Sequence, residues 1–206
     1  MDKEQSTKNQ HDEQSNFSSQ MFHYIRSENS LKLQAAILFF VTKFPGRMNR
    51  ILLCKHLYYM DGHFFQKFGK TITGFLYLHI EGSPQPVCFN EIMQILITEK
   101  KIEVIPFLET ENRDEGIVFT LKGLTFKPIA EIPDVFDREE KKVMNSIAST
   151  LGGDLSLETR FYPNLYQEYA QTGLYEKIEM KPFAEGKRPH LQWKAWANRI
   201  FRLKWQ

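Results

Sequence analysis

The clearest helical periodicity in this 206-residue chain spans residues 48–68, and it constrains how the neighbouring segments can pack. Five residues recur there at steps of three and four, as on one face of a helix: Met48, Ile51, Leu52, Lys55 and Tyr59. Gly69 follows, and glycine is the residue type that most often ends a helix. A helix of this length needs other elements to cover its apolar face, so we expect a core built around it.

The segments on either side supply such elements. Residues 31–44 are strongly apolar and stop at Pro45, which predicts a buried helix. Residues 72–80 are rich in β-branched and aromatic side chains and predict a strand. The glycine and two prolines of residues 82–86 predict a turn, and the apolar stripe of residues 89–100 predicts another helix.

The second half of the chain continues with strand and helix patterns. Residues 102–107 and 116–121 predict an antiparallel hairpin joined by the polar loop 109–115. Asp137 followed by Glu140 predicts a capping box at the start of a helix that runs to Leu151. A further helical stretch begins at Ser156 and is kinked or restarted at Pro163. We therefore expect an α+β fold, a mainly helical single domain with a small antiparallel β element.

The two ends differ in composition from the middle. Residues 1–20 contain too few apolar groups to offset the entropy of ordering, which predicts a disordered polar tail before a domain of residues 21–180. Residues 181–206 form a basic aromatic extension that includes Trp193, Trp196 and Arg199. Three roles stay open for it: docking on a partner, binding nucleic acid, or packing on its own domain, with membrane-surface binding a minor fourth.

Charge and cysteine content exclude several classes of protein. A formal net charge of +2 gives no general nucleic-acid or membrane signal. No apolar run reaches the length of about 18 residues that a spanning helix needs, and no apolar signal stretch opens the chain. Cys54 and Cys88 lie in apolar surroundings, which indicates two buried thiols in a reduced, cytoplasmic compartment.

The motifs of common enzyme classes are missing from the sequence. It has no glycine-rich phosphate loop, no Gly-x-Ser-x-Gly and no His-Glu-x-x-His. His56 and His63 are seven residues apart, which on a helix separates them by about 10 Å, too far to share one ion. We therefore expect no metal, no cofactor and no enzymatic activity.

Lys55, Tyr58 and Asp61 form the most informative polar set, because their three-residue spacing places them on one helix face. They either form a polar patch that contacts a partner or a buried hydrogen-bond network that holds this helix against residues 72–74. The second interpretation is favoured, since a buried polar network fixes packing.

Residues 48–96 resemble the Panacea domain, also called the SocA-like antitoxin domain. The family pattern L-x-K-x-L-Y-x-x-D is met by Leu53, Lys55, Leu57, Tyr58 and Asp61. The glycine, the Ile-Thr-Gly strand and the tyrosine that follow are met by Gly69, Ile72, Thr73, Gly74 and Tyr77. The proline turn is Gly82-Ser83-Pro84-Gln85-Pro86, with one residue inserted after the glycine, and residues 161–169 lack the His and Trp of many members. The resemblance covers residues 31–173.

The resemblance implies an antitoxin that neutralises a cognate protein toxin by binding it. We expect the contact residues to be Lys55, Tyr58, Asp61, Tyr77, Pro84, Pro86, Trp193, Trp196 and Arg199. One alternative is a protease adaptor that delivers the toxin for degradation. Another is a winged-helix-like DNA-binding autoregulator, although Glu91 and Glu99 on the candidate recognition helix would repel phosphates.

Overall fold

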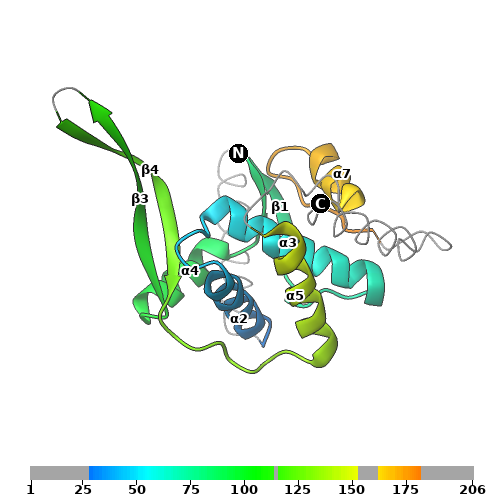
Figure 1. Ribbon diagram of the computed structural model, residues 1–206. Coiled ribbons are helices and arrows are strands. Elements are labelled where there is room, and N and C mark those ends of the chain that lie inside the picture. The colour runs from blue at the N-terminus through cyan, green and yellow to red at the C-terminus, as the bar shows by residue number, and fades with distance from the viewer. Residues whose placement is uncertain (1–27, 114–115, 153–161, 182–206) are drawn as a thin grey trace, which may run out of the picture.

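The computed structural model describes residues 28–113, 116–152 and 162–181. Within these ranges the chain forms five helices and two antiparallel sheets of two strands each, which confirms the expected α+β class. The helices gather into one body, and a long hairpin projects from it at the left of Figure 1. The predicted tail of residues 1–20 and the extension of residues 181–206 lie, except for Lys181, outside the described residues.

Helix α3, Arg50–Phe68, is the centre of the fold. Asn49 caps its first turn by accepting a hydrogen bond from the backbone N–H of Leu52 at 2.9 Å. Gly69 ends it in the left-handed region with φ 72°, as the sequence predicts. Helix α2, Glu28–Lys43, packs beside α3, and both contribute fully buried side chains to the core.

The predicted strand over residues 72–80 is only half formed. Strand β1 is Tyr77–Ile80, and residues 72–76 are irregular. The predicted turn over residues 82–86 is confirmed only at Gly82, because Ser83–Pro86 form strand β2, antiparallel to β1. Pro84 and Pro86 have no backbone N–H to donate, and strand β1 does not need one from them. Their β1 partners, His79 and Tyr77, form backbone hydrogen bonds with residues 175–178 instead.

Helix α4, Phe89–Thr98, leads into the second sheet. Strand β3, Ile102–Arg113, pairs with strand β4, Gly116–Pro128, over their whole length, with one irregularity at Phe107/Leu108. The predicted loop 109–115 is thus largely strand. This part of the hairpin extends beyond the helical body (Figure 1), so a polar sequence there does not prevent strand pairing.

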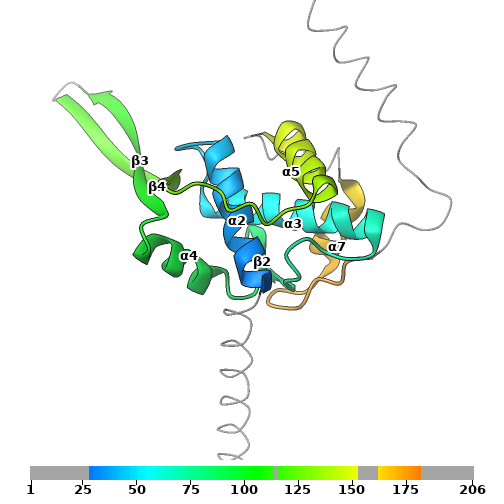
Figure 2. The ribbon, with the colours of Figure 1, turned by 90° about the horizontal axis from the view of Figure 1, so that it is seen from below.

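The last two helices of the described chain complete the body. Helix α5, Arg138–Leu151, begins with the predicted capping box. The Asp137 side chain accepts a hydrogen bond from the Glu140 N–H at 2.8 Å, and the Glu140 side chain accepts one from the Asp137 N–H at 2.9 Å. Helix α7, Pro163–Gln171, begins at its proline, as the sequence predicts, while the start of this stretch at Ser156 lies outside the described residues. Figure 2 shows α5 and α7 at the same end of α3, far from the hairpin.

Cys54 and Cys88 are buried and unbridged, and burial raises the pKa of the Cys54 thiol to about 12. These properties fit the two buried thiols predicted from the sequence. None of the helices in the described ranges combines the length and apolar character needed to cross a membrane.

Candidate functional site

A buried carboxylate holds α3 against the segment that follows it. The side chain of Asp61 is fully buried, and each of its oxygens accepts two hydrogen bonds. Oδ1 accepts from the backbone N–H groups of Ile72 and Thr73 at 2.7 and 2.9 Å. Oδ2 accepts from the Thr73 hydroxyl and from the Tyr77 hydroxyl, the latter at 2.8 Å. Four donors match the acceptor capacity of one carboxylate.

The electrostatics of this network follow from its burial. Burial raises the pKa of Asp61, while the four donated hydrogen bonds lower it in part. The pKa of Tyr77 is raised well above its usual value, first by burial and then by the adjacent Asp61 charge. Tyr77 therefore stays protonated and acts as a hydrogen-bond donor at neutral pH.

Tyr58 connects the same helix to α7. Its hydroxyl donates to the backbone carbonyl of Leu165 at 2.9 Å, and burial raises its pKa. Gly62 lies one turn further along α3, where a Cβ atom would stand 2.5 Å from Leu165 Cδ2. The lack of a side chain at Gly62 thus lets α7 approach α3 closely.

These contacts bear on the two interpretations of the polar set. Tyr58, Asp61 and Tyr77 are at most 1% exposed, and Pro84 and Pro86 are buried as well. The fold covers these side chains in this conformation, which favours the buried network, and their role as contact residues stays a prediction. Lys55 is half-buried on α3. The predicted contacts Trp193, Trp196 and Arg199 lie outside the described residues.

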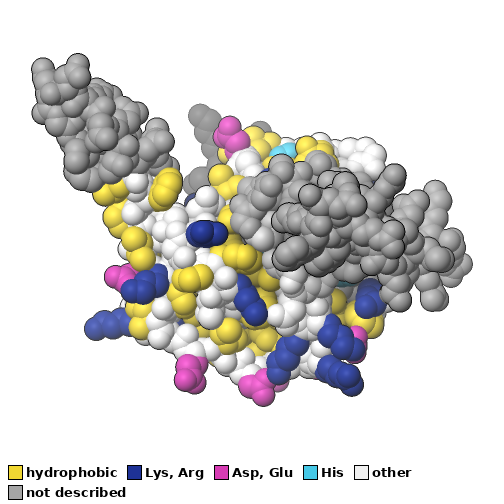
Figure 3. Space-filling model, in the orientation of Figure 1, with side chains coloured by type: hydrophobic (Ala, Val, Ile, Leu, Met, Phe, Trp, Pro, Cys, Tyr) yellow, Lys and Arg dark blue, Asp and Glu magenta, His cyan; other side chains and the backbone are white. Residues whose placement is uncertain are grey.

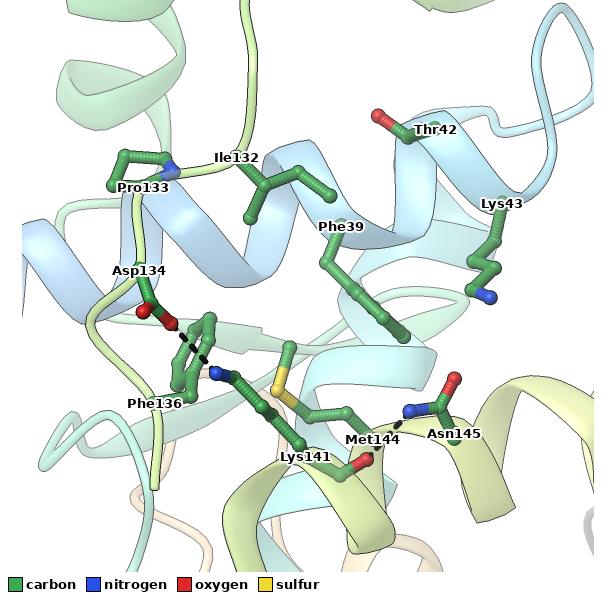
Figure 4. Close-up of a pocket in the computed structure, with 10 residues that line it drawn as sticks. All are labelled: Phe39, Thr42, Lys43, Ile132, Pro133, Asp134, Phe136, Lys141, Met144 and Asn145. Atoms are coloured by element: carbon green, nitrogen blue, oxygen red, sulfur yellow. Dashed lines mark hydrogen bonds and ion pairs between the residues drawn. The ribbon is translucent and has the colours of Figure 1, made fainter. Parts of the chain in front are cut away.

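An accessible concave surface lies elsewhere, where α2, the connecting segment 129–137 and the start of α5 meet (Figure 4). We call this hollow of about 610 Å³ the α2–α5 groove. Ten residues line it: Phe39, Thr42, Lys43, Ile132, Pro133, Asp134, Phe136, Lys141, Met144 and Asn145. Met144 is fully buried and forms part of the floor, whereas Phe39 and Ile132 are only partly buried.

Basic side chains border the α2–α5 groove. A second hollow of about 640 Å³ adjoins it along the exposed face of α5 and is lined by Arg138, Lys141, Lys142 and Asn145. These residues follow a helical spacing of three, four and seven, so they share one face. Figure 3 shows apolar side chains in the middle of this view and Lys and Arg side chains toward its lower right.

The helix that carries this basic face is fixed to the body by a partly buried ion pair. Lys32 Nζ of α2 lies 2.5 Å from Glu140 Oε1, and the Glu140 side chain is 4% exposed. Glu140 also bonds the backbone N–H of Asp137. The wall formed by α2 and the wall formed by α5 are therefore held at a defined separation.

The described residues contain no group of three or more His, Cys, Asp or Glu side chains placed to hold a metal ion. The His56 side chain is fully buried and that of His63 is partly buried, and burial lowers the pKa of both. What the surface offers chemically is apolar contact and positive charge.

Sequence reasoning did not identify the α2–α5 groove. Its walls come from α2, α5 and the segment 129–137, and only tertiary packing brings these together. One local signal existed, the spacing of Arg138, Lys141 and Lys142 behind a capping box. That spacing indicates an exposed basic helix face, but it carries no information about the apolar wall opposite.

One comparison with known proteins found a match. The model of the family described as "Antitoxin SocA-like, Panacea domain" matches residues 53–156. The matched segment includes most of α3, both hairpins and α5, and hence the whole Asp61 network. No curated protein and no solved structure matches the chain.

Proposed function

This chain belongs to the antitoxin SocA-like, Panacea domain family, and from that membership we propose that it is an antitoxin that neutralises a cognate protein toxin by binding it directly. The family match over half of the chain is the observation that carries the proposal. We place the action in the cytoplasm, where Cys54 and Cys88 stay reduced.

The site geometry supports binding without a chemical step. Three of the buried polar groups of the matched segment, Asp61, Tyr58 and Tyr77, have hydrogen-bond partners within the fold. These three groups hold the elements in place, and none of them faces a substrate. The accessible α2–α5 groove combines apolar walls with basic rims, the kind of surface that recognises another protein.

The test is co-expression with the product of the adjacent gene. The proposal predicts that the neighbouring protein arrests growth when it is expressed alone, and that growth returns when this chain is expressed with it. It also predicts that the two proteins purify as one complex. A neighbour that is harmless alone, or that stays toxic beside this chain, contradicts the proposal.

Steady-state levels separate direct neutralisation from a protease adaptor. Direct binding leaves the toxin intact in a lasting complex, so its amount is unchanged or higher when this chain is present. An adaptor shortens the lifetime of the toxin. Pulse-chase labelling of the toxin with and without this chain measures that lifetime.

One feature of the fold favours a second function, DNA-binding autoregulation. Helix α4 is followed directly by the long β3–β4 hairpin, which is the order of a recognition helix and a wing. Glu91 on α4 and Glu99 at its C-cap are at least partly accessible and would repel phosphates. Salt-dependent binding to the upstream DNA, measured by fluorescence anisotropy, would support this second function.

A further inference from the structure

We propose that the α2–α5 groove is the docking site for the toxin and that it binds an acidic segment with an apolar anchor. This inference rests on the proposed function and names the partner chemistry of the binding site. The apolar part of the argument comes from the groove walls, because Phe39 of α2 and Ile132 of the connecting segment both point into it over a buried floor (Figure 4). Such a wall can bury an apolar side chain of a partner.

The sign of the partner's charge follows from the rim. Four basic side chains border the two hollows: Lys43, Arg138, Lys141 and Lys142. Among the residues that line the two hollows Asp134 is the one acid, and it forms an ion pair with Lys141 at 2.6 Å; Glu139, outside the lining, pairs with Lys142 at 2.5 Å. Four bases against one acid in the lining leave positive charge in excess, so an acidic partner is complementary.

The two ion pairs do not oppose docking. Both are exposed, with 51% and 55% of the lysine side chains accessible, and exposed pairs contribute little to stability. The lysines can therefore turn to a partner's carboxylates at small cost. Within the described ranges Lys43 and Arg138 make no ion pair, and Lys43 lies 5.5 Å from the centre of the Phe39 ring, beside the apolar wall.

A protein segment fits this surface better than a nucleic acid does. Asp134 and Glu139 interrupt the basic rim, and a phosphate backbone would pass close to both. The floor residues Phe136 and Met144 are buried, so Phe39 is the one aromatic ring among the lining residues that a base could reach. Apolar anchors flanked by carboxylates satisfy the wall and the rim together.

The test measures the affinity of the full chain for the purified product of the adjacent gene, used as an inactive variant, by calorimetry. K43E/K142E reverses two charges at the groove and is expected to weaken binding by about tenfold or more. K127E/K177E is the matched control, with the same charge change at two lysines that are 57% and 48% exposed and lie outside the groove. The control is expected to bind within about twofold of the wild type.

Two further variants test the same groove if the charge reversal K43E/K142E disturbs folding. K43Q/K142Q removes the charges without adding acids, and I132S removes the apolar anchor point. Each is expected to weaken binding several-fold, while circular dichroism shows an unchanged helix content. Wild-type affinity in all three groove variants overturns the groove as docking site and leaves the proposed function standing.

Other occupants give different results. No binding by the wild-type chain overturns the proposed function and the docking site with it. If deletion of residues 182–206 raises the affinity for the toxin and the charge reversal has no effect, this segment of the chain itself occupies the groove.

The groove binds nucleic acid if K43E/K142E no longer binds a 20-base-pair duplex of the upstream DNA but still binds the protein partner. Both of these last results contradict the proposal.

Discussion

At the scale of single residues, Asp61 has the widest structural effect, because its buried carboxylate accepts backbone hydrogen bonds that a neighbouring strand would otherwise accept. The backbone N–H groups of Ile72 and Thr73 donate to it and not to a neighbouring strand. The segment therefore stays irregular despite its β-branched composition. A buried donor must find an acceptor somewhere, and here a carboxylate supplies it.

Removing this carboxylate should destabilise the fold severely. Asp61→Ala leaves two backbone N–H groups and two hydroxyls without their acceptor, and we expect a loss of about 3–5 kcal/mol in the free energy of unfolding. Asp61→Asn should lose less, because its amide oxygen still serves the two N–H groups. Urea denaturation measures both.

The matched control for this series is Asp134→Ala. Asp134 is 85% exposed and, within the described chain, bonds only Lys141, so its loss should leave the free energy of unfolding almost unchanged. Equal costs at Asp61 and Asp134 would contradict the structural role given to the buried network.

His56 should make stability depend on pH. It lies in the core beside Phe40 and Phe44, and burial lowers its pKa against the opposing effect of the Leu52 and Gly152 backbone. The unfolded chain, with a histidine pKa of about 6.5, therefore takes up the proton first as the pH falls. The folded-state pKa lies below the unfolded one, so this stabilising contribution is present above the unfolded pKa and is lost as the pH falls below about 6.5.

The variant His56→Phe isolates this effect. Other titrating groups, including Asp61 and His63, remain in both proteins, so the difference between the two pH profiles of unfolding free energy reports His56 alone. The variant should lose less stability than the wild type between pH 7.5 and 5.5. Parallel profiles would show that His56 does not titrate differently in the folded state.

At the scale of elements, α3 is a shared support for the segments on both sides of it. It holds residues 72–77 through Asp61 and α7 through Tyr58 and Gly62. Residues 175–178 in turn bond β1, with Ile178 N–H donating to the Tyr77 carbonyl at 2.8 Å. Residues 162–178, which follow the matched family segment, are thus packed onto it.

Gly62→Ala should push α7 away from α3. The added Cβ would stand 2.5 Å from Leu165 Cδ2, and we expect a net cost of about 1 kcal/mol after the gain in helix propensity. Leu165→Ala in the same chain removes the clash, so the double-mutant cycle should show a favourable coupling above about 0.5 kcal/mol. Gly123→Ala, where no atom lies within 4 Å of the added Cβ, is the control.

Elements with local signals could be predicted from the sequence, and elements made by distant contacts could not. The helices around residues 31–44, 48–68 and 89–100 follow from apolar periodicity, and the capping box at Asp137 follows from two residues. Strand β2 could not be predicted, because two prolines next to a glycine are typical of a turn. They fit a strand here only because the backbone groups opposite them in β1 bond residues 175–178, a contact that the local sequence does not reveal.

The candidate site also has a part that the local sequence predicts and a part that it does not. The spacing of Tyr58 and Asp61 indicated a buried network, because residues three apart on a helix share a face. The identity of the accessible surface depended on three segments far apart in the sequence, and no local pattern joins Phe39, Ile132 and Lys141.

At the scale of the whole molecule, the fold separates a rigid interior from an accessible groove. Asp61, Tyr58 and Gly62 hold α3 to its neighbours, and the Lys32–Glu140 pair holds the two walls of the groove. A preformed surface loses little entropy on binding and so favours affinity. This arrangement suits a protein that acts by binding its partner and covering part of the partner's surface.

The most direct test of neutralisation by occupancy is a titration of the purified toxin's activity with this chain. We predict a linear loss of activity that ends at a fixed molar ratio of the two proteins. We also predict that denaturing the complex and refolding the separated toxin restores its full activity with its mass unchanged. Inactivation of many toxin molecules by one molecule of this chain, or a toxin of altered mass, would contradict direct binding.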